Sequence, residues 1–129
     1  MNKICTSIEQ SKKLIELGID VNTADMYWKN GVSDRYIQCF TPFVCGDYQN
    51  GINFDYDIPA WSLSALLGLM PTDDKRDEYY VDIESHSDYH TVSYRNCWDG
   101  CIYSEVSEES LLDAAFEMTC WLLENKKIQ

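Results

Sequence analysis

The chain has 129 residues, which is the length of one domain and is enough to bury a hydrophobic core without disulfides or metal ions. Hydrophobic residues make up 45% of the chain and charged residues 25%, and these ordinary globular values argue against disorder. The 22 Asp and Glu residues outnumber the 10 Lys and Arg residues, which gives a formal net charge of −12. Because such a surface repels phosphate groups, we expect no direct binding to nucleic acid or to an anionic membrane.

The six cysteines would permit a disulfide framework in a secreted chain. However, no apolar run approaches the ~18 residues of a membrane span. The first residues also lack the apolar stretch of a signal peptide. The sequence therefore predicts a cytoplasmic protein with free thiols at Cys5, Cys39, Cys45, Cys97, Cys101 and Cys120.

The first element that we expect is a helix over residues 7–17. Thr6 and Glu9 fit a capping box, in which each side chain accepts a hydrogen bond from the backbone N–H of the other residue. Gly18 can adopt the left-handed conformation that ends many helices, and Ile19 can then fold back onto the last turn. The apolar face of this helix would consist of Ile8, Leu14, Ile15 and Leu17.

The region between this helix and Pro59 is predicted to contain short strands. Segments rich in aromatic and β-branched residues lie at 24–28, 35–41 and 52–56. Two Asn-Gly pairs, at 30–31 and 50–51, are typical of hairpin turns because both residues tolerate positive φ. Pro59 suits the first turn of a helix, where its missing N–H costs nothing, so a second, apolar helix is expected from Pro59 to Leu67.

A three-stranded antiparallel meander is predicted at about 78–84, 89–98 and 101–105. In this prediction Asp99 and Gly100 form a two-residue turn, and residues 85–88 form a loop. The resulting register sorts the side chains onto two faces. The apolar face collects Tyr79, Val81, Ile83, His90, Val92, Tyr94, Trp98, Cys101 and Tyr103. The solvent-facing side collects Tyr80, Asp82, Glu84, Tyr89, Thr91, Ser93, Arg95 and Ser104, with Glu78 opposite Arg95.

Ser107 is predicted to cap the last helix, with Glu108 and Glu109 in its first turn and two lysines, Lys126 and Lys127, at its end. Its apolar residues cover more than half its circumference, which indicates a central packing element. They are Leu111, Leu112, Ala115, Phe116, Met118, Trp121, Leu122 and Leu123. The sequence thus predicts a single α+β domain over residues 1–129. Its antiparallel sheet, made of the C-terminal three-stranded meander and the N-terminal hairpin strands, would be covered on one face by about three helices.

Three stretches together resemble an uncharacterised family of short acidic proteins encoded by prophages and mobile elements of gut bacteria. They are Thr-Ala-Asp-Met at 23–26, Pro-Ala-Trp-Ser-Leu-Ser-Ala-Leu-Leu at 59–67, and the closing segment from Asp113 to Asn125. The resemblance implies an accessory gene of a phage or mobile element. It implies no activity and transfers no functional residue.

Neither metal binding nor catalysis is indicated by a motif. His86, His90, Cys97 and Cys101 are close in sequence, but the predicted register places the two cysteines on opposite faces, so we expect no metal site. The chain has no Gly-x-Ser-x-Gly, no His-Glu-x-x-His and no P-loop. We therefore expect no cofactor and no enzymatic activity, while an unusual small enzyme remains an alternative.

Residues 73–113 hold most of the excess charge, with twelve acidic against three basic residues, a net −9. Two tyrosines on the predicted solvent-facing side are interleaved with carboxylates, a combination that suits either a protein interface or a cationic small ligand. The candidate partner-binding residues are Tyr80, Asp82, Glu84 and Tyr89 together with Asp73, Asp74 and Asp77. A face that serves only solubility would have the same composition.

The leading hypothesis is a non-enzymatic, acidic accessory protein that binds a basic protein partner and inhibits a host defence component. The alternative is a protein that binds or sequesters a small molecule such as a nucleotide. An anionic ligand, however, would need converging basic residues, and the chain has only ten. A homo-oligomer is compatible with either reading.

Overall fold

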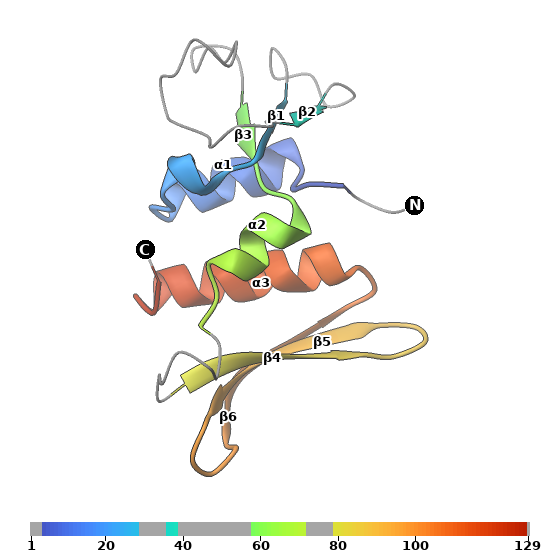
Figure 1. Ribbon diagram of the computed structural model, residues 1–129, viewed down its shortest axis with the longest axis vertical. Helices are drawn as coiled ribbons and strands as arrows, with labels where there is room; N and C mark the ends of the chain where they lie inside the picture. The colour runs from blue at the N-terminus through green and yellow to red at the C-terminus, as the bar shows by residue number, and fades with distance from the viewer. Residues whose placement is uncertain (1–3, 29–35, 39–57, 72–78, 129) are drawn as a thin grey trace.

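The computed structural model describes residues 4–28, 36–38, 58–71 and 79–128 (Figure 1). These residues form an α+β arrangement, as predicted. The first half comprises α1 (Ile8–Glu16), a 3-10 turn (Val21–Thr23), β1 (Met26–Trp28), β2 (Tyr36–Gln38), β3 (Ile58–Ala60) and α2 (Leu63–Gly68). The second half comprises β4 (Tyr79–Ser85), β5 (His90–Asn96), β6 (Ile102–Glu108) and α3 (Leu111–Glu124).

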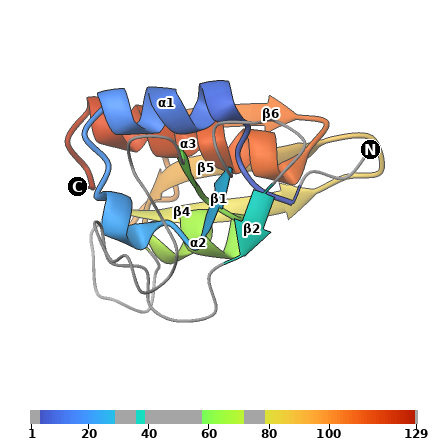
Figure 2. The ribbon, with the colours of Figure 1, turned by 90° about the horizontal axis from the view of Figure 1, so that it is seen from above.

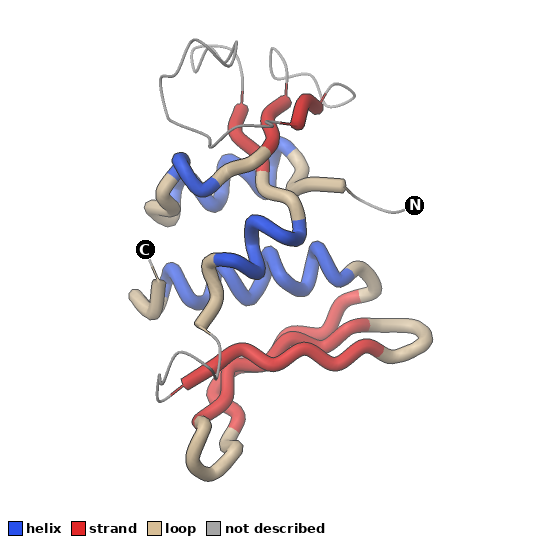
Figure 3. The backbone as a smooth tube through the Cα atoms, viewed as in Figure 1, coloured by secondary structure: helices blue, strands red, loops and turns tan. Residues whose placement is uncertain are grey.

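The described strands form two separate antiparallel sheets, in the orders β2-β1-β3 and β4-β5-β6. Figure 3 shows these sheets at opposite ends of the molecule, with the helices between them. The longest helix, α3, packs on β5 and β6 on one side and on α1 and α2 on the other (Figure 1). It is therefore the central packing element that its apolar circumference predicts.

The first helix begins one residue later than its capping prediction. Ser7, not Thr6, is the N-cap, and its side chain forms a capping box with Gln10. The end is as predicted, because Gly18 has a φ of +94° and the Ile19 N–H donates to the Leu14 carbonyl. Of the expected apolar face, Leu14 is fully buried but Ile15 is exposed. Figure 2 shows α1 running alongside α3, and the Gln10 side chain donates to Asp113 across them.

Thr6 does not cap the helix because it is buried in a tertiary contact. Its Oγ1 accepts a hydrogen bond from the Trp61 N–H, and its own N–H donates to the Trp61 carbonyl. Its hydroxyl also lies 2.8 Å from the Ser11 hydroxyl, so both the hydroxyl and the backbone N–H of Thr6 already have partners. This network ties the start of the chain to the segment that enters α2.

Pro59 lies in β3 and not in the first turn of a helix, which corrects the prediction for this segment. It pairs with Tyr27 at the edge of the small sheet, where a residue without an N–H is tolerated. The helix begins only at Leu63 because Ser62 is its N-cap and accepts from the Ala65 N–H. The two Asn-Gly turns and the strand expected at 52–56 lie outside the described residues.

The β4–β5 pairing keeps the predicted faces but differs in register. Glu84 lies opposite Thr91 instead of Tyr89, and Arg95 lies opposite Tyr80 instead of residue 78. The loop is formed by residues 86–89, one position later than expected. Because the register shift is two residues, every side chain of these two strands stays on its predicted side of the sheet.

The β5–β6 turn contradicts the prediction. It contains four residues, 97–100, because the Asn96 N–H donates to the Cys101 carbonyl and the Asn96 side chain accepts from the Trp98 N–H. A register shift at Tyr94 and Arg95 then makes Tyr103 an extra residue on β6. The predicted apolar positions Trp98, Cys101 and Tyr103 are consequently exposed.

The last helix also begins three residues later than predicted. β6 extends through Ser107 to Glu108, so the N-cap is Ser110, whose side chain accepts from the Asp113 N–H. At the other end Lys126 adopts a φ of +57°, and the Lys127 N–H donates to the Leu122 carbonyl. The apolar positions predicted for this helix are buried or pack against the core, which confirms its role.

Candidate protein-binding surface

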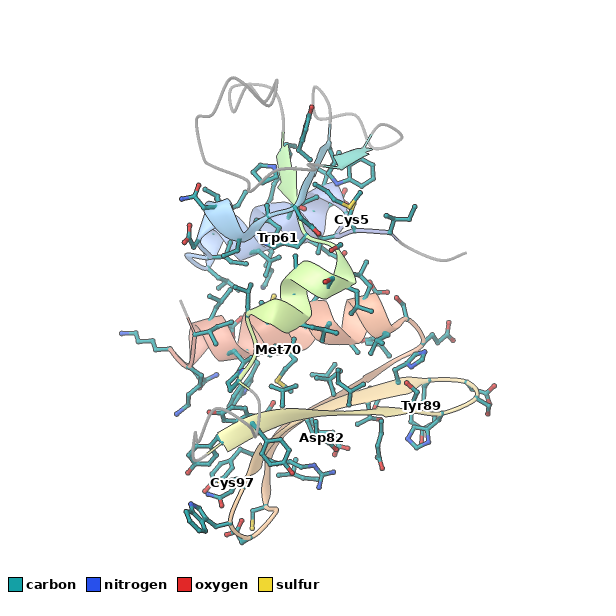
Figure 4. All side chains as sticks on the ribbon, in the orientation of Figure 1. Cys5, Trp61, Met70, Asp82, Tyr89 and Cys97 are labelled. Atoms are coloured by element: carbon teal, nitrogen blue, oxygen red, sulfur yellow. The ribbon has the colours of Figure 1, made fainter. Side chains whose placement is uncertain are left out.

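The outer face of the meander is the side turned away from α3. Val92 and Tyr94 on β5 belong to the core that α3 completes, so the alternate positions of the sheet point outward. Figure 4 shows Asp82 on this outer side of β4. The register places on it Tyr80, Asp82, Glu84, Thr91, Ser93, Arg95, Glu105 and Ser107.

The middle of the outer face is less acidic than the sequence suggests. Asp82 Oδ2 lies 3.6 Å from Arg95 Nε, and the same Nε–H donates to the Ser93 hydroxyl at 3.2 Å. Thr91 and Ser93 are buried because these short side chains lie on the central strand between longer neighbours. The Arg95 charge therefore offsets that of Asp82. Two carboxylates of this face, Glu84 and Glu105, have no Lys or Arg within 4 Å among the described residues. The His86 ring lies 3.9 Å from Glu84.

The predicted site residues separate into two groups. Tyr80 and Asp82 lie with Arg95 toward the β5–β6 turn. Glu84 and Tyr89 lie toward the β4–β5 loop, where the His86 ring stacks on Tyr89 with centroids 4.4 Å apart. Figure 4 shows Tyr89 and Cys97 at opposite ends of the meander. The remaining candidates, Asp73, Asp74 and Asp77, lie outside the described residues.

The two most exposed large apolar side chains of the described residues, Trp98 and Tyr103, lie at or beside the β5–β6 turn. We call Trp98, Ile102 and Tyr103 the hairpin tip; their exposed fractions are 85%, 46% and 58%. The turn projects away from the helices (Figure 1). Isolated exposed hydrophobic residues are common, but three within six positions, on the turn and the start of β6, make this end of the hairpin a candidate interaction site.

The hairpin tip is connected to the core by a series of aromatic contacts. The Tyr103 ring meets the Tyr79 ring edge-on at 5.0 Å, and Tyr79 stacks on Tyr94 at 5.4 Å. Tyr94 in turn contacts Trp121 of α3 at 5.3 Å. The hydrogen bond with Tyr79 is the main cause that raises the pKa of Tyr103 to about 12, so this phenol stays neutral at physiological pH. These contacts restrict the Tyr103 ring, and a restricted side chain loses less entropy on binding.

The sequence does not predict the hairpin tip, because Asp99-Gly100 is typical of a two-residue turn. The signal that could have revealed it is Asn96, an Asx-turn residue that precedes Trp98 and competes with the Asp99-Gly100 pair for the position of the turn. With Asn96 as the turn's first residue, Trp98 leaves the strand and loses its place on the apolar face.

The described cysteines are free thiols, as predicted. Burial raises the pKa of Cys5 to about 11 and that of Cys120 to about 12. Cys97 and Cys101 are exposed in the turn, and a hydrogen bond with Asp99 raises the pKa of Cys101. Within the described residues, no three His, Cys, Asp or Glu side chains are grouped closely enough to hold a metal ion.

Searches against protein-family models, curated proteins and solved structures found no match to this chain. Across the described part of the chain, none of the helices has the length and apolar character needed to cross a membrane.

Proposed function

We propose that this chain is a non-enzymatic accessory protein of a phage or mobile element and that it binds a basic protein partner through the meander. The observation that carries the proposal is the exposure of Trp98, Ile102 and Tyr103 at one end of a hairpin in a chain with a net charge of −12. Tryptophan and tyrosine are the residue types most enriched among those that dominate binding energy at protein interfaces.

The charge distribution supports a basic partner. Asp99 lies within the turn beside Trp98, and Glu105 lies on β6 two residues beyond Tyr103. An apolar centre with acidic residues around it matches the anatomy of a protein interface, in which a desolvated core is surrounded by a polar rim. The acidic rim would accelerate association with a basic surface and would disfavour anionic ligands such as nucleotides.

The biological role belongs to the same proposal. A small acidic protein from a mobile element that covers a basic surface of a host defence component would inhibit that component. The resemblance of residues 23–26, 59–67 and 113–125 to prophage-encoded proteins supports this role.

The test is affinity capture from a lysate of the bacterium that encodes the chain, quantified by mass spectrometry. Trp98→Ala is expected to weaken capture of the partner by about 30-fold or more, the equivalent of ~2 kcal/mol for a dominant contact. Ile15→Ala is the matched control because it removes an exposed apolar side chain from α1. Capture is also expected to fall as salt rises, since the Debye length is ~8 Å at physiological ionic strength.

Two results would contradict the proposal. One is that Trp98→Ala captures the same proteins as the wild type. The other is that the captured proteins are acidic and bind equally well at high salt.

A further inference from the structure

β6 is an edge strand with an open side. In the strand order β4-β5-β6 it pairs only with β5 among the described strands. It runs for seven residues, Ile102–Glu108, and most of them are exposed. An edge strand of this length presents a row of backbone N–H and C=O groups to which another chain can add.

The backbone pairing identifies the groups on the open side. The Val81 N–H donates to the Pro71 carbonyl, outside the meander, so the backbone N–H and C=O groups of Val81 point away from β5. Along an antiparallel strand the backbone groups of successive residues point alternately toward and away from the neighbouring strand. The same alternation applies to β5 and β6. The backbone groups of Ser104 and Val106, which lie opposite Tyr94 and Val92, are bonded to β5, whereas those of Glu105 and Ser107 point outward. No hydrogen bond from the backbone groups of Glu105 or Ser107 to a residue outside the sheet is found in the described part of the chain.

The opposite edge of the meander is already partly covered. On β4 the outward N–H of Val81 is bonded to the Pro71 carbonyl at 2.9 Å, so an added strand would find this group already occupied. The outward backbone groups of Glu105 and Ser107 on β6 have no such bond in the described part of the chain. β6 is therefore the candidate edge for strand addition, and β4 is the matched reference edge in the same sheet.

The side chains of β6 define the chemistry of an added strand. Glu105 lies on the outer face and Glu108 ends the strand, followed directly by Glu109, and β6 carries no Lys or Arg. Opposite charges placed across neighbouring strands stabilise their pairing, whereas like charges destabilise it. A second copy of this chain is disfavoured because both copies carry a net charge of −12, and an antiparallel pair centred on Glu105 would place the two glutamates face to face.

We infer that β6 binds an extended, basic segment of the partner as a fourth strand of the meander, with Ile102 and Tyr103 providing an apolar contact at one end. This inference rests on the proposed function and specifies the binding mode and the chemistry of the partner. Lys or Arg residues at alternate positions of the segment would face Glu105, and its backbone would bond to the outward groups of Glu105 and Ser107.

The probe is a phage-displayed library of random dodecapeptides selected on the immobilised protein. We expect enrichment of peptides with Lys or Arg at alternate positions. Glu105→Pro removes an outward N–H at an edge position where proline is tolerated, and it should weaken the enriched peptides by about tenfold or more. Glu105→Gln keeps the N–H and should weaken them by about fivefold at most. Ile83→Pro makes the equivalent change on β4 and should leave the affinity unchanged.

Amide hydrogen exchange gives a second readout that uses only the wild-type chain. Addition of an enriched peptide is expected to slow exchange at Glu105 and Ser107 but not at Ile83, since only the β6 edge acquires new hydrogen bonds. Val106 serves as an internal reference because its N–H is already bonded to β5.

The inference is overturned if no peptide is enriched, if enriched peptides bind Glu105→Pro like the wild type, or if exchange slows at Ile83 instead. It is also overturned by a concentration-dependent dimer that Glu105→Pro abolishes, because a second copy would then occupy the edge. If Trp98→Ala abolishes partner capture while Glu105→Pro leaves capture unchanged, strand addition is wrong and the proposed function stands. If neither variant affects capture, both are wrong.

Discussion

The entrance to α2 and the β5–β6 turn each contain a tryptophan, but the two side chains have opposite surroundings. Trp61 is fully buried, its backbone is bonded to Thr6, and its indole N–H donates to the Thr23 hydroxyl at 2.9 Å. Trp98 has 85% of its surface exposed, and the hydrogen bond found for it is from its backbone N–H to Asn96. The aromatic residues of this chain therefore fall into two groups: some are buried and hold the fold together, and others are exposed to solvent.

The largest expected effect is on the buried side of this comparison. Trp61→Ala should lower the free energy of unfolding by ~3–5 kcal/mol, because the substitution opens a cavity at the centre of the core and leaves the Thr23 hydroxyl without its donor. Trp98→Ala should change it by no more than ~0.5 kcal/mol, because little surface of this side chain is buried.

Urea denaturation of both variants beside the wild type measures the difference. Equal destabilisation by the two substitutions would show that the hairpin tip packs against the protein in solution, and it would remove the basis for treating the tip as a binding surface.

The two hairpins of the meander show how far the sequence could predict the fold. Apolar and polar residues alternate along β4 and β5. Registers that keep the apolar residues buried therefore differ from one another by two residues, and they place each side chain on the same face. The β5–β6 strands contain a bulge, which moves the following residues to the other face. Alternation alone cannot locate a bulge, because its position depends on the Asn96 hydrogen bonds and on the ring contacts of Tyr79 with Tyr103.

The helix starts show the same limit on a smaller scale. Each predicted helix start lies one to four residues before the observed one: Ser7 replaces Thr6 as the first cap, the second helix begins at Leu63 instead of Pro59, and Ser110 replaces Ser107. In each case an earlier residue satisfies a local capping rule but is used by a long-range contact or by a strand. Local sequence therefore predicts that a helix begins nearby, and tertiary contacts select which serine caps it.

The candidate site could be predicted only in part for a related reason. The outward positions of Tyr80, Asp82 and Glu84 follow from strand alternation, which the sequence contains. The partner of Asp82 depends on register, and the two-residue difference brings Arg95 beside it instead of beside residue 78. The exposure of Trp98 and Tyr103 depends on the four-residue turn and the bulge, whereas strand alternation alone predicts both on the apolar face.

A smaller effect separates the two carboxylates of β4. Asp82→Lys should lower the free energy of unfolding by about 0.5–1 kcal/mol, because it replaces the attraction to Arg95 with repulsion at a partly exposed site. Glu84→Lys makes the same change in net charge where the side chain is 62% exposed, and it should stay within ~0.5 kcal/mol of the wild type.

Urea denaturation at low and high salt tests this pair, since screening should bring the two variants closer together. Equal stability at low salt would mean that the Asp82–Arg95 contact contributes nothing, and the outer face would then be as acidic as the sequence suggests.

The smallest expected effect concerns the thiols, which follow the same division between core and turn. At pH 8 the buried Cys5, with a pKa of about 11, is ionised in only about one molecule in a thousand, and Cys120, with a pKa of about 12, in fewer. Since the thiolate is the reactive form, iodoacetamide should modify Cys97 in the exposed turn long before either buried residue, as resolved by peptide mass spectrometry. Modification restricted to the turn should leave the melting temperature within about one degree of the untreated protein, because these side chains contribute no burial. Raising the pH above about 9 should instead destabilise the protein. The unfolded chain ionises its thiols in this range while the folded core keeps Cys5 and Cys120 neutral, so the free energy of unfolding falls between pH 9 and about 12. Modification of Cys5 as fast as Cys97 at pH 8 would show that the N-terminal segment opens readily, and the contacts of Thr6 with Trp61 would then be too weak to hold it in place.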